Sequence, residues 1–380
     1  LKPTLMPRVL ESFNLVGVNA DLVIVEGAGS PAEINLRAGD IANMGFAQAA
    51  DVPVVLVGDI DRGGVIASIL GTFELLEASE RARIRGFIVN KFRGDVSLFD
   101  DGVTILEDRT GARCFGVVPF FSNARRLPQE DAMALEYRER DVLGGTIKIA
   151  VPRLARIANF DDLDPLAAEP DVAVVIIDPG TAFPGDADVI FLPGSKATLA
   201  DLQQVRDEGW DTDILAHHRR GGMIVGLCGG YQILGRAVAD PDGIEGPPGE
   251  APGLGLLDVT TVLGGDKSLV ERTGTEVESG EAVRGYEMHI GQTLGQDTTR
   301  PWLTLADGRA EGAISSDGRV MASYLHGVFA ADGFRRQFLE RLGSQTSGTA
   351  YEASVEQALD DLAAHMETHL DLDALLDVAH

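Results

Sequence analysis

Short apolar runs alternate with segments of helical periodicity, and this alternation restricts the fold more than any other feature of the chain. The runs are rich in β-branched residues and are bounded by Gly, Asp or Pro, as strands buried on both faces of a parallel sheet are. In the first third of the chain they lie at residues 21–25, 52–57, 87–89 and 115–118. Residues 64–76 carry apolar side chains at helical spacing. The pattern predicts a layered α/β sheet with right-handed crossovers.

The alternation resumes after a polar stretch, so the chain of 380 residues is predicted to form two domains. The second set of strands is expected at residues 147–151, 172–177, 189–192 and 223–227. Antiparallel structure is expected over 255–325, a helix near 334–342 and one or two amphipathic helices over 355–376. We predict a first domain over 1–121, a linker over 122–146, a second domain over 147–343 and an acidic helical tail over 344–380.

Charge and cysteine content exclude several classes of partner. The net charge is −27 with a pI near 4.5, so the phosphates of nucleic acid or of an anionic membrane would be repelled. No apolar run reaches the roughly 18 residues of a membrane span. The two cysteines, Cys114 and Cys228, fit the reducing cytoplasm. Few lysines with many carboxylates would also suit a salt-loving host, a hypothesis that requires stability to rise between low and molar salt.

The sharpest local signal is the segment GLCGGYQ at residues 226–232. A predicted strand runs directly into Gly-x-Cys-x-Gly and a helical pattern follows, which is the pattern of a nucleophile elbow with sulfur in place of oxygen. Glycines are needed where the nucleophile sits at a strained turn. The helix N-terminus favours a thiolate over a thiol. Cys228 is therefore the candidate nucleophile; the alternative is a buried structural cysteine beside a Gly-rich turn.

A cysteine nucleophile needs a base, because a free thiol is only a few per cent ionised at neutral pH. Among seven histidines, His326 is the best candidate, since it ends a strand-like run and precedes Gly327. His289 is the second candidate. His365 and His369 stand four residues apart on the predicted tail helix, but their spacing matches no zinc motif and no third ligand is evident.

An acyl-transfer site also needs N–H donors for the developing oxyanion. The segment LPGSK at residues 192–196 follows a predicted strand and can supply the amide of Gly194 or of Ser195. The amide of Gly229, next to the nucleophile, can supply the second donor. The alternative reading of residues 192–196 is an ordinary turn between a strand and a helix.

Over nearly the whole chain, these and other motifs resemble the cobyric acid synthase family, glutamine-dependent enzymes that amidate peripheral carboxylates of the corrin ring in cobalamin synthesis. The motifs that carry the resemblance are, in chain order, VEGAGSPAEINL from Val25, GDIDRGGVIAS from Gly58, VNKFRGD from Val89, LARIANFDDLDPL from Leu154, FLPGSKATLADL from Phe191, GLCGGYQILG from Gly226, RGYEMHIG from Arg284 and YLHGVF from Tyr324.

The resemblance implies a dethiobiotin synthetase-like, P-loop NTPase-like parallel sheet domain followed by a flavodoxin-like class I glutamine amidotransferase domain. Cys228 would attack the side-chain amide of L-glutamine, and His326 would activate the thiol and protonate the leaving ammonia. Gln232 matches a position that contacts bound glutamine, and Arg284 and Glu287 lie in a motif near it.

In the first domain the resemblance implies ATP-dependent activation of a corrin carboxylate, followed by displacement of phosphate by ammonia. Glu26 matches a Mg²⁺-binding carboxylate, and Asn90 and Lys91 match an adenine-reading segment. The implied reaction converts adenosylcobyrinic acid a,c-diamide to cobyric acid in the cytoplasm. Association of the chain into a homo-oligomer is left open.

Two departures from the family pattern qualify this hypothesis. Many class I glutaminases carry a glutamate two residues after the histidine, where this chain has Val328. We therefore expect either a Cys–His dyad or a carboxylate from elsewhere. The chain also contains no Gly-x-x-x-x-Gly-Lys-Ser/Thr phosphate loop. We interpret it as a truncated synthetase domain in which the ATP-dependent half is impaired.

Several other interpretations stay open. Residues 27–32 match a loose dinucleotide fingerprint, although Glu26 would then face a pyrophosphate. The substrates implied by the resemblance are anionic, so this acidic chain would need local cations to bind them. The candidate cations, which are otherwise solvated surface, are Arg62, Lys91, Arg93, Arg125 and Arg126. Alternative functions are another corrin or cell-wall amidotransferase of the same layout, a glutamine-independent cysteine hydrolase, and a non-catalytic scaffold.

Overall fold

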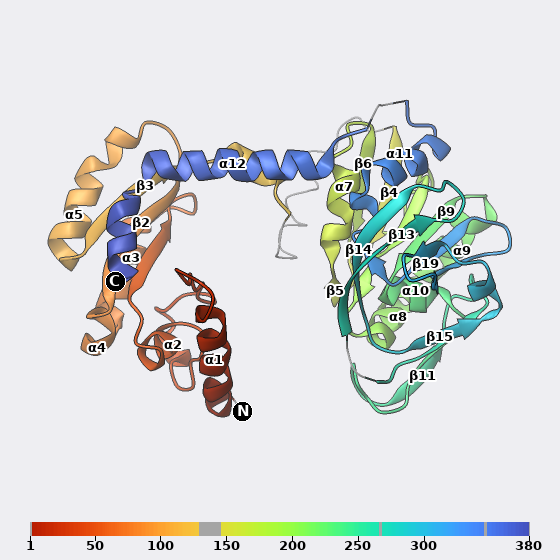
Figure 1. Ribbon diagram of the computed structural model, residues 1–380, viewed down its shortest axis with the longest axis horizontal. Coiled ribbons are helices and arrows are strands. Elements are labelled where there is room, and N and C mark those ends of the chain that lie inside the picture. Colours follow the sequence, from red (N-terminus) through yellow and green to blue (C-terminus); the bar gives the residue numbers. More distant parts are fainter. Residues whose placement is uncertain (1, 129–145, 266–267, 346–347, 380) are drawn as a thin grey trace. The chain divides into compact units, whose positions relative to one another are not determined.

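The computed structural model describes residues 2–128, 146–265, 268–345 and 348–379, which form two compact units (Figure 1). The first unit contains Leu1–Ala124 and Ala358–His380, and the second contains Arg125–Gln357. Most of the linker expected over 122–146 lies outside the described residues. No helix in the described ranges is both long and apolar enough to cross a bilayer.

The first unit is built on a three-stranded parallel sheet in the order β1-β2-β3. Its strands are β1 (Val54–Asp59), β2 (Ile84–Phe92) and β3 (Arg113–Pro119), at three of the four places expected from the sequence. Helices α3 (Val65–Leu75) and α5 (Asp100–Thr110) provide the crossovers. Ile69, Phe87 and Leu106 from these elements share one apolar core, so the predicted alternation of strand and helix is confirmed here.

The strand expected at residues 21–25 is absent, and that prediction is wrong. The segment is irregular and lies at the surface, with Ile24 88% exposed. A strand forms only where its N–H and C=O groups find ladder partners. Among the described residues no strand pairs with this segment, and β1 pairs only with β2. The remaining short elements of this region are α1 (Lys2–Gly17), η1 (Ile34–Leu36), α2 (Met44–Ala49), α4 (Ala78–Arg81), η2 (Val96–Phe99) and η3 (Ser122–Arg126).

The acidic tail forms two helices, as expected, α12 (Tyr351–His369) and α13 (Leu372–Ala379). The end of α12 docks on β3. The N–H of Asp371 donates to the carbonyl of Phe115 at 2.8 Å, and Nε2 of His365 lies 2.9 Å from the carbonyl oxygen of Pro119. Gly116 allows this close approach, because a Cβ there would stand 2.1 Å from the carbonyl of His369.

The second unit is organised around a six-stranded sheet in the order β18-β19-β9-β7-β4-β6. All of its neighbours are parallel except the edge pair β18/β19. The strands are β4 (Ile147–Pro152), β6 (Val172–Ile177), β7 (Val189–Leu192), β9 (Met223–Leu227), β18 (Ala313–Ile314) and β19 (Val320–Ser323). The four strands expected from the sequence in this part of the chain are all present.

Helices cover both faces of this sheet (Figure 1). One face packs against α7 and α11 around Trp302 and Phe329, and the other packs against α8, α9 and α10 around Trp210. The helices are α7 (Asp164–Ala167), α8 (Thr198–Asp207), α9 (Trp210–Arg219), α10 (Gly229–Leu234) and α11 (Asp332–Arg341). Short 3₁₀ turns are η5 (Phe160–Leu163), η6 (Gln296–Thr299) and η7 (Val328–Ala330).

Three smaller sheets complete the second unit, and two of them border the candidate site. A five-stranded sheet runs β17-β16-β13-β14-β20, a four-stranded sheet runs β11-β10-β12-β15, and β5 pairs with β8. The strands are β5 (Ile157–Ala158), β8 (Gly194–Ser195), β10 (Ala237–Asp240), β11 (Gly249–Pro252), β12 (Val259–Val262), β13 (Ser268–Glu276), β14 (Ala282–His289), β15 (Gln292–Gly295), β16 (Leu303–Leu305), β17 (Ala310–Glu311) and β20 (Leu325–His326).

Candidate active site

Cys228 lies at the sharp turn between β9 and α10. Its backbone has a positive φ of 51°, a strained conformation that costs a non-glycine residue on the order of 1–3 kcal/mol. The turn is held by the N–H of Cys228, which donates to the carbonyl of Ser323 at 2.9 Å. The thiol lies 3.5 Å from the carbonyl of Met288. This strand–turn–helix is the geometry of a nucleophile elbow.

The glycines around Cys228 are required by close packing. A Cβ at Gly230 would stand 2.0 Å from the carbonyl oxygen of Leu192, and one at Gly226 would stand 2.5 Å from a methyl of Leu234. The first contact is with backbone on the neighbouring strand β7, which cannot move aside easily. The sequence Gly-x-Cys-x-Gly is therefore what allows the turn to sit against the sheet.

His326 is completely buried at the end of β20 and is held by a carboxylate. Its Nδ1–H donates to Oδ2 of Asp162 at 2.7 Å, and Oδ1 of Asp162 accepts the N–H of Gly327 at 2.6 Å. Asp162 is itself buried, in the turn η5. Nε2 of His326 has no hydrogen-bond partner among the described residues. The imidazole therefore has one nitrogen fixed by a carboxylate and the other free for proton transfer.

The protonation of His326 follows from its burial and from its two neighbours, Asp162 and Cys228. Burial alone would lower the pKa of His326, but the Asp162 carboxylate and the nearby sulfur of Cys228 together raise this pKa to about 10. No contact between Nε2 and the sulfur meets hydrogen-bond geometry, so the influence of Cys228 is that of a close neighbour. The imidazole is consequently cationic at neutral pH, poised to stabilise a thiolate and to donate a proton.

The expected oxyanion segment lies against the elbow as β8. The N–H of Lys196 donates to the carbonyl of Arg156 at 2.9 Å. Hydrogen-bonded and non-hydrogen-bonded pairs alternate along an antiparallel ladder, so the next pair, Ser195 and Ile157, is not hydrogen-bonded. The N–H of Ser195 therefore points away from β5. A Cβ at Gly229 would stand 2.7 Å from this nitrogen, so the amides of Ser195 and Gly229 are neighbours.

Gly194 lies beside the histidine. A Cβ at this position would stand 3.2 Å from Cε1 of His326. The hydroxyl of Ser195 is not free to react, because it donates to Oδ2 of Asp201 at 2.6 Å and accepts the N–H of Ala197. The structure thus brings five predicted residues together: Gly194, Ser195, Cys228, Gly229 and His326.

Comparison with known proteins agrees with this geometry. Residues 148–334 match the model of the CobB/CobQ-like glutamine amidotransferase domain, and residues 12–126 match an AAA domain model. A cobyric acid synthase of Rhodobacter capsulatus is 59% identical over 379 residues, covering 100% of this chain and 78% of the relative. Cobyric acid synthases of Ruegeria sp. and Mesorhizobium japonicum are 57% and 56% identical, each with 100% of this chain and 77% of the relative covered.

The chain belongs to the cobyric acid synthase family. The predicted family and fold class, a P-loop-type α/β domain joined to a glutamine amidotransferase domain, are confirmed. So is the predicted class of enzyme, an amidotransferase of cobalamin biosynthesis.

In this member of the cobyric acid synthase family, Asp162 is the residue that the sequence analysis missed. It lies in the motif LARIANFDDLDPL, which carried the resemblance but was given no role. Three aspartates, Asp161, Asp162 and Asp164, crowd this motif, and spacing alone does not separate them. The one signal in the sequence was Val328, which stands where many class I glutaminases have a glutamate. A carboxylate that orients the histidine would therefore have to come from elsewhere in the chain.

The predicted glutamine-binding residues lie in three different environments. Gln232 is buried, and its amide oxygen accepts the hydroxyl of Thr198 at 2.8 Å. Glu287 is buried and accepts hydrogen bonds from Arg272 and Arg309. Burial alone would raise the pKa of Glu287, but the hydrogen bonds from the two arginines outweigh burial and lower it. The side chain of Arg284 is 61% exposed and pairs with Glu352 on α12. No described contact joins Arg284 to Cys228.

The predicted nucleotide-site residues lie in the first unit. Asn90 and Lys91 lie near the end of β2, where Nζ of Lys91 pairs with Asp59 at 2.8 Å. Glu26 is exposed in the irregular segment that precedes η1. No three His, Cys, Asp or Glu side chains of the described residues are placed to hold a metal ion.

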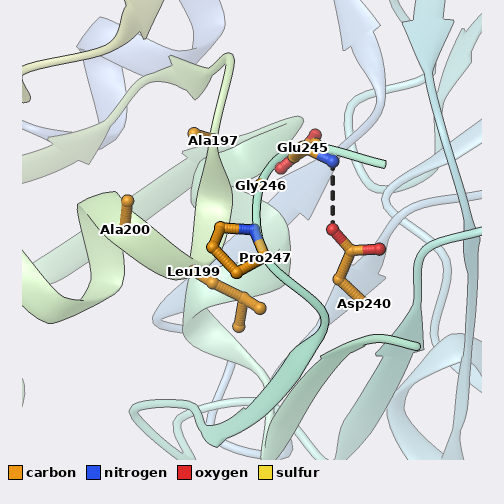
Figure 2. A pocket seen from close by; sticks show the side chains of 7 residues that line it. All are labelled: Ala197, Leu199, Ala200, Asp240, Glu245, Gly246 and Pro247. Carbon is orange, nitrogen blue, oxygen red and sulfur yellow. Dashed lines mark hydrogen bonds between the residues drawn. The ribbon is translucent and has the colours of Figure 1, made fainter. Parts of the chain in front are cut away.

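A small pocket lies beside the N-terminal end of α8. Figure 2 shows Asp240 accepting the N–H of Glu245 there, at 3.0 Å. Oε2 of Glu245 in turn accepts the N–H of Thr198 at 2.7 Å. The pocket is lined by Ala197, Leu199, Ala200, Asp240, Glu245, Gly246 and Pro247. None of the predicted site residues lines it, and we assign it no function.

Proposed function

We propose that Cys228, His326 and Asp162 form a triad that hydrolyses L-glutamine to glutamate and ammonia. The observation that carries this proposal is the buried Asp162–His326 pair, which leaves Nε2 free next to Cys228. A carboxylate at Nδ1 sets the tautomer and stabilises the imidazolium that proton transfer creates. The absence of the usual glutamate at position 328 therefore does not leave the histidine unsupported.

In the first half of the reaction, the thiolate of Cys228 attacks the side-chain carbonyl carbon of glutamine. The amides of Gly229 and Ser195 are placed to receive the oxyanion of the tetrahedral intermediate. The proton on Nε2 of His326 passes to the amide nitrogen as the C–N bond breaks and ammonia leaves. A thioester to Cys228 remains.

In the second half, water clears the thioester. His326 has given up its proton and now accepts one from the attacking water, so hydroxide adds to the thioester carbon. The C–S bond breaks, glutamate leaves, and the pair returns to thiolate and imidazolium. We infer that Gln232, Glu287 and Arg284 contribute to glutamine binding, Gln232 because it follows the nucleophile by one helical turn and Glu287 because it shares β14 with Met288.

For the whole protein we propose ATP- and glutamine-dependent amidation of peripheral carboxylates of adenosylcobyrinic acid a,c-diamide, giving cobyric acid. The names of the relatives support this assignment. Glu26 is the proposed Mg²⁺ ligand, and Asn90 with Lys91 the proposed adenine-reading segment. Two free thiols, Cys114 and Cys228, support a reducing cytoplasm as the compartment.

The glutaminase proposal is tested by ammonia release from glutamine by the wild-type chain and by Cys228→Ala. Loss of a catalytic nucleophile costs on the order of 10⁶-fold, so even a low rate should vanish. Cys114→Ala is the matched control, because this half-buried cysteine belongs to β3 of the other unit. Equal rates in wild type and Cys228→Ala would overturn the proposal, as would failure of an electrophilic glutamine analogue to label Cys228 in a protein that releases no ammonia.

A further inference from the structure

The hydrogen bond that His326 donates to Asp162 does not by itself fix the orientation of the His326 ring. It fixes the position of Nδ1, but the torsion between Cβ and an imidazole ring is broad and roughly two-fold. Nε2 has no partner among the described residues that could supply a second fixed point. Since a misplacement of about 1 Å in a reacting group can cost 10²-fold in rate, the plane of the ring needs a restraint of its own.

Tyr286 supplies a contact on the face of this ring. Its ring centroid lies 5.3 Å from that of His326, with the two planes 20° apart. The contact is set by the backbone, because Tyr286 on β14 is directly opposite His326 on β20 in the antiparallel register. Asp162 thus holds the imidazole at its edge and Tyr286 holds it at its face.

Asn159 ties these two contacts together. The side-chain Nδ2 of Asn159 donates to the hydroxyl of Tyr286 at 2.5 Å. The backbone carbonyl of Asn159 accepts the backbone N–H of Asp162 at 3.2 Å. Asn159 has φ of 52°, a left-handed conformation that lets the chain leave β5 and enter the turn η5. One residue therefore anchors both the tyrosine on the ring face and the turn that carries the carboxylate.

The same segment also reaches the oxyanion strand. Ala158, the residue before Asn159, pairs with Gly194 in the β5/β8 ladder. Residues 157–162 therefore contact the oxyanion strand β8, Tyr286 and His326.

We propose that Tyr286 and Asn159 are positioning residues of the glutaminase, which keep the plane of the His326 ring aligned so that Nε2 faces Cys228. The inference rests on the proposed glutamine hydrolysis. Tyr286 holds the ring by stacking, and Asn159 holds Tyr286 by its amide. Neither side chain exchanges protons with the substrate, so their loss should lower kcat far more than it raises KM.

The experiment compares Tyr286→Phe, Asn159→Gly, the double variant and Tyr286→Leu in the full chain. Glycine at 159 keeps the left-handed turn while removing the amide. Loss of one hydrogen bond predicts that each of the first two lowers kcat for glutamine by roughly two- to tenfold. Because both remove the same bond, the double variant should be no slower than the slower single variant. Tyr286→Leu removes the stacking ring and should lower kcat on the order of 10²-fold.

A second readout does not depend on activity. An aromatic face favours a cation, so the imidazole of His326, followed by NMR, should titrate at lower pH in Tyr286→Leu than in wild type. Tyr351→Phe on α12 is the matched hydroxyl deletion and should change neither kcat nor the titration. Near-UV circular dichroism reports whether each variant folds. If Tyr286→Leu does not fold, the Tyr286→Phe and Asn159→Gly cycle still decides the question.

The inference is overturned if the Tyr286→Phe and Asn159→Gly losses multiply in the double variant, or if folded Tyr286→Leu keeps both wild-type kcat and the wild-type titration of His326. A wild-type chain that releases no ammonia and is not labelled at Cys228 would instead refute the proposed function. In that case the NMR titration of Tyr286→Leu still tests whether Tyr286 holds the imidazole.

Discussion

Asp162 and His326 are 164 residues apart in the chain, yet Oδ2 of the aspartate lies 2.7 Å from Nδ1 of the histidine. The position two residues after the histidine, where a glutamate would be expected in many class I glutaminases, is occupied by the buried Val328. The carboxylate therefore reaches the imidazole from the turn that follows β5 and not from the strand end that carries the histidine. Tertiary packing therefore supplies the carboxylate of the proposed triad.

Asp162→Asn should lower kcat for glutamine on the order of 10³- to 10⁴-fold with a small change in KM. The amide keeps the shape of the carboxylate but cannot stabilise the imidazolium or select the tautomer with Nδ1–H. Steady-state ammonia release measures the effect. Asp186→Asn is the control, because Asp186 is exposed and pairs only with Lys148 in the described contacts. A loss below tenfold in Asp162→Asn would mean that the site works as a Cys–His dyad.

Gly230→Ala should destabilise the second unit by about 1–3 kcal/mol or prevent its folding. The new methyl would stand 2.0 Å from the carbonyl oxygen of Leu192, a backbone atom in the middle of the sheet. Gly185→Ala is the matched control, since a Cβ there meets open space. Urea unfolding of the two variants measures the difference. Equal midpoints would show that α10 can shift away from β7 without cost.

The stability of the protein should fall as the pH rises from about 6.5 toward 10. Burial lowers the pKa of His326, but Asp162 and Cys228 outweigh burial and raise the folded-state pKa from 6.5 to about 10. The folded protein then holds a proton that the unfolded chain has released, so this stabilisation is complete below about pH 6.5 and is lost as the pH approaches 10. The free energy of unfolding should fall by up to about 1.4 kcal/mol per pH unit.

Urea unfolding across this pH range, for wild type and for Asp162→Asn, isolates the contribution of His326. The variant has lost the carboxylate that raises the histidine pKa most, so its stability should depend less steeply on alkaline pH. Identical slopes in the two proteins would contradict the assignment of this dependence to the Asp162–His326 pair.

Glu287 should stabilise the protein at neutral pH and lose this effect in acid. Burial would raise its pKa, but hydrogen bonds from Arg309 and Arg272 hold the pKa below its usual value of 4.5. The contribution is therefore present above about pH 4.5 and is lost as the pH falls through the lower folded-state pKa. Glu287→Gln should be less stable than wild type at pH 7, and the two acid-unfolding curves should converge at low pH. A constant difference at every pH would exclude the charge as the cause.

The absence of the strand expected at residues 21–25 shows that an apolar, β-branched composition does not by itself determine a strand. The composition DLVIV is that of a buried strand, but a strand also needs neighbours for its backbone, and the described residues supply none. The segment that the pattern placed in the core therefore lies at the surface, with Ile24 exposed.

Local features of this protein could be predicted from its sequence because they depend on neighbouring residues. The Gly-x-Cys-x-Gly turn, the strands that lead to it and the histidine that ends β20 are all of this kind. The tertiary structure alone decided that Asp162 and not Asp161 or Asp164 meets His326, because only folding brings η5 to the end of β20. It also decided that the N–H of Ser195 points away from β5, since this direction depends on how β5 and β8 are paired.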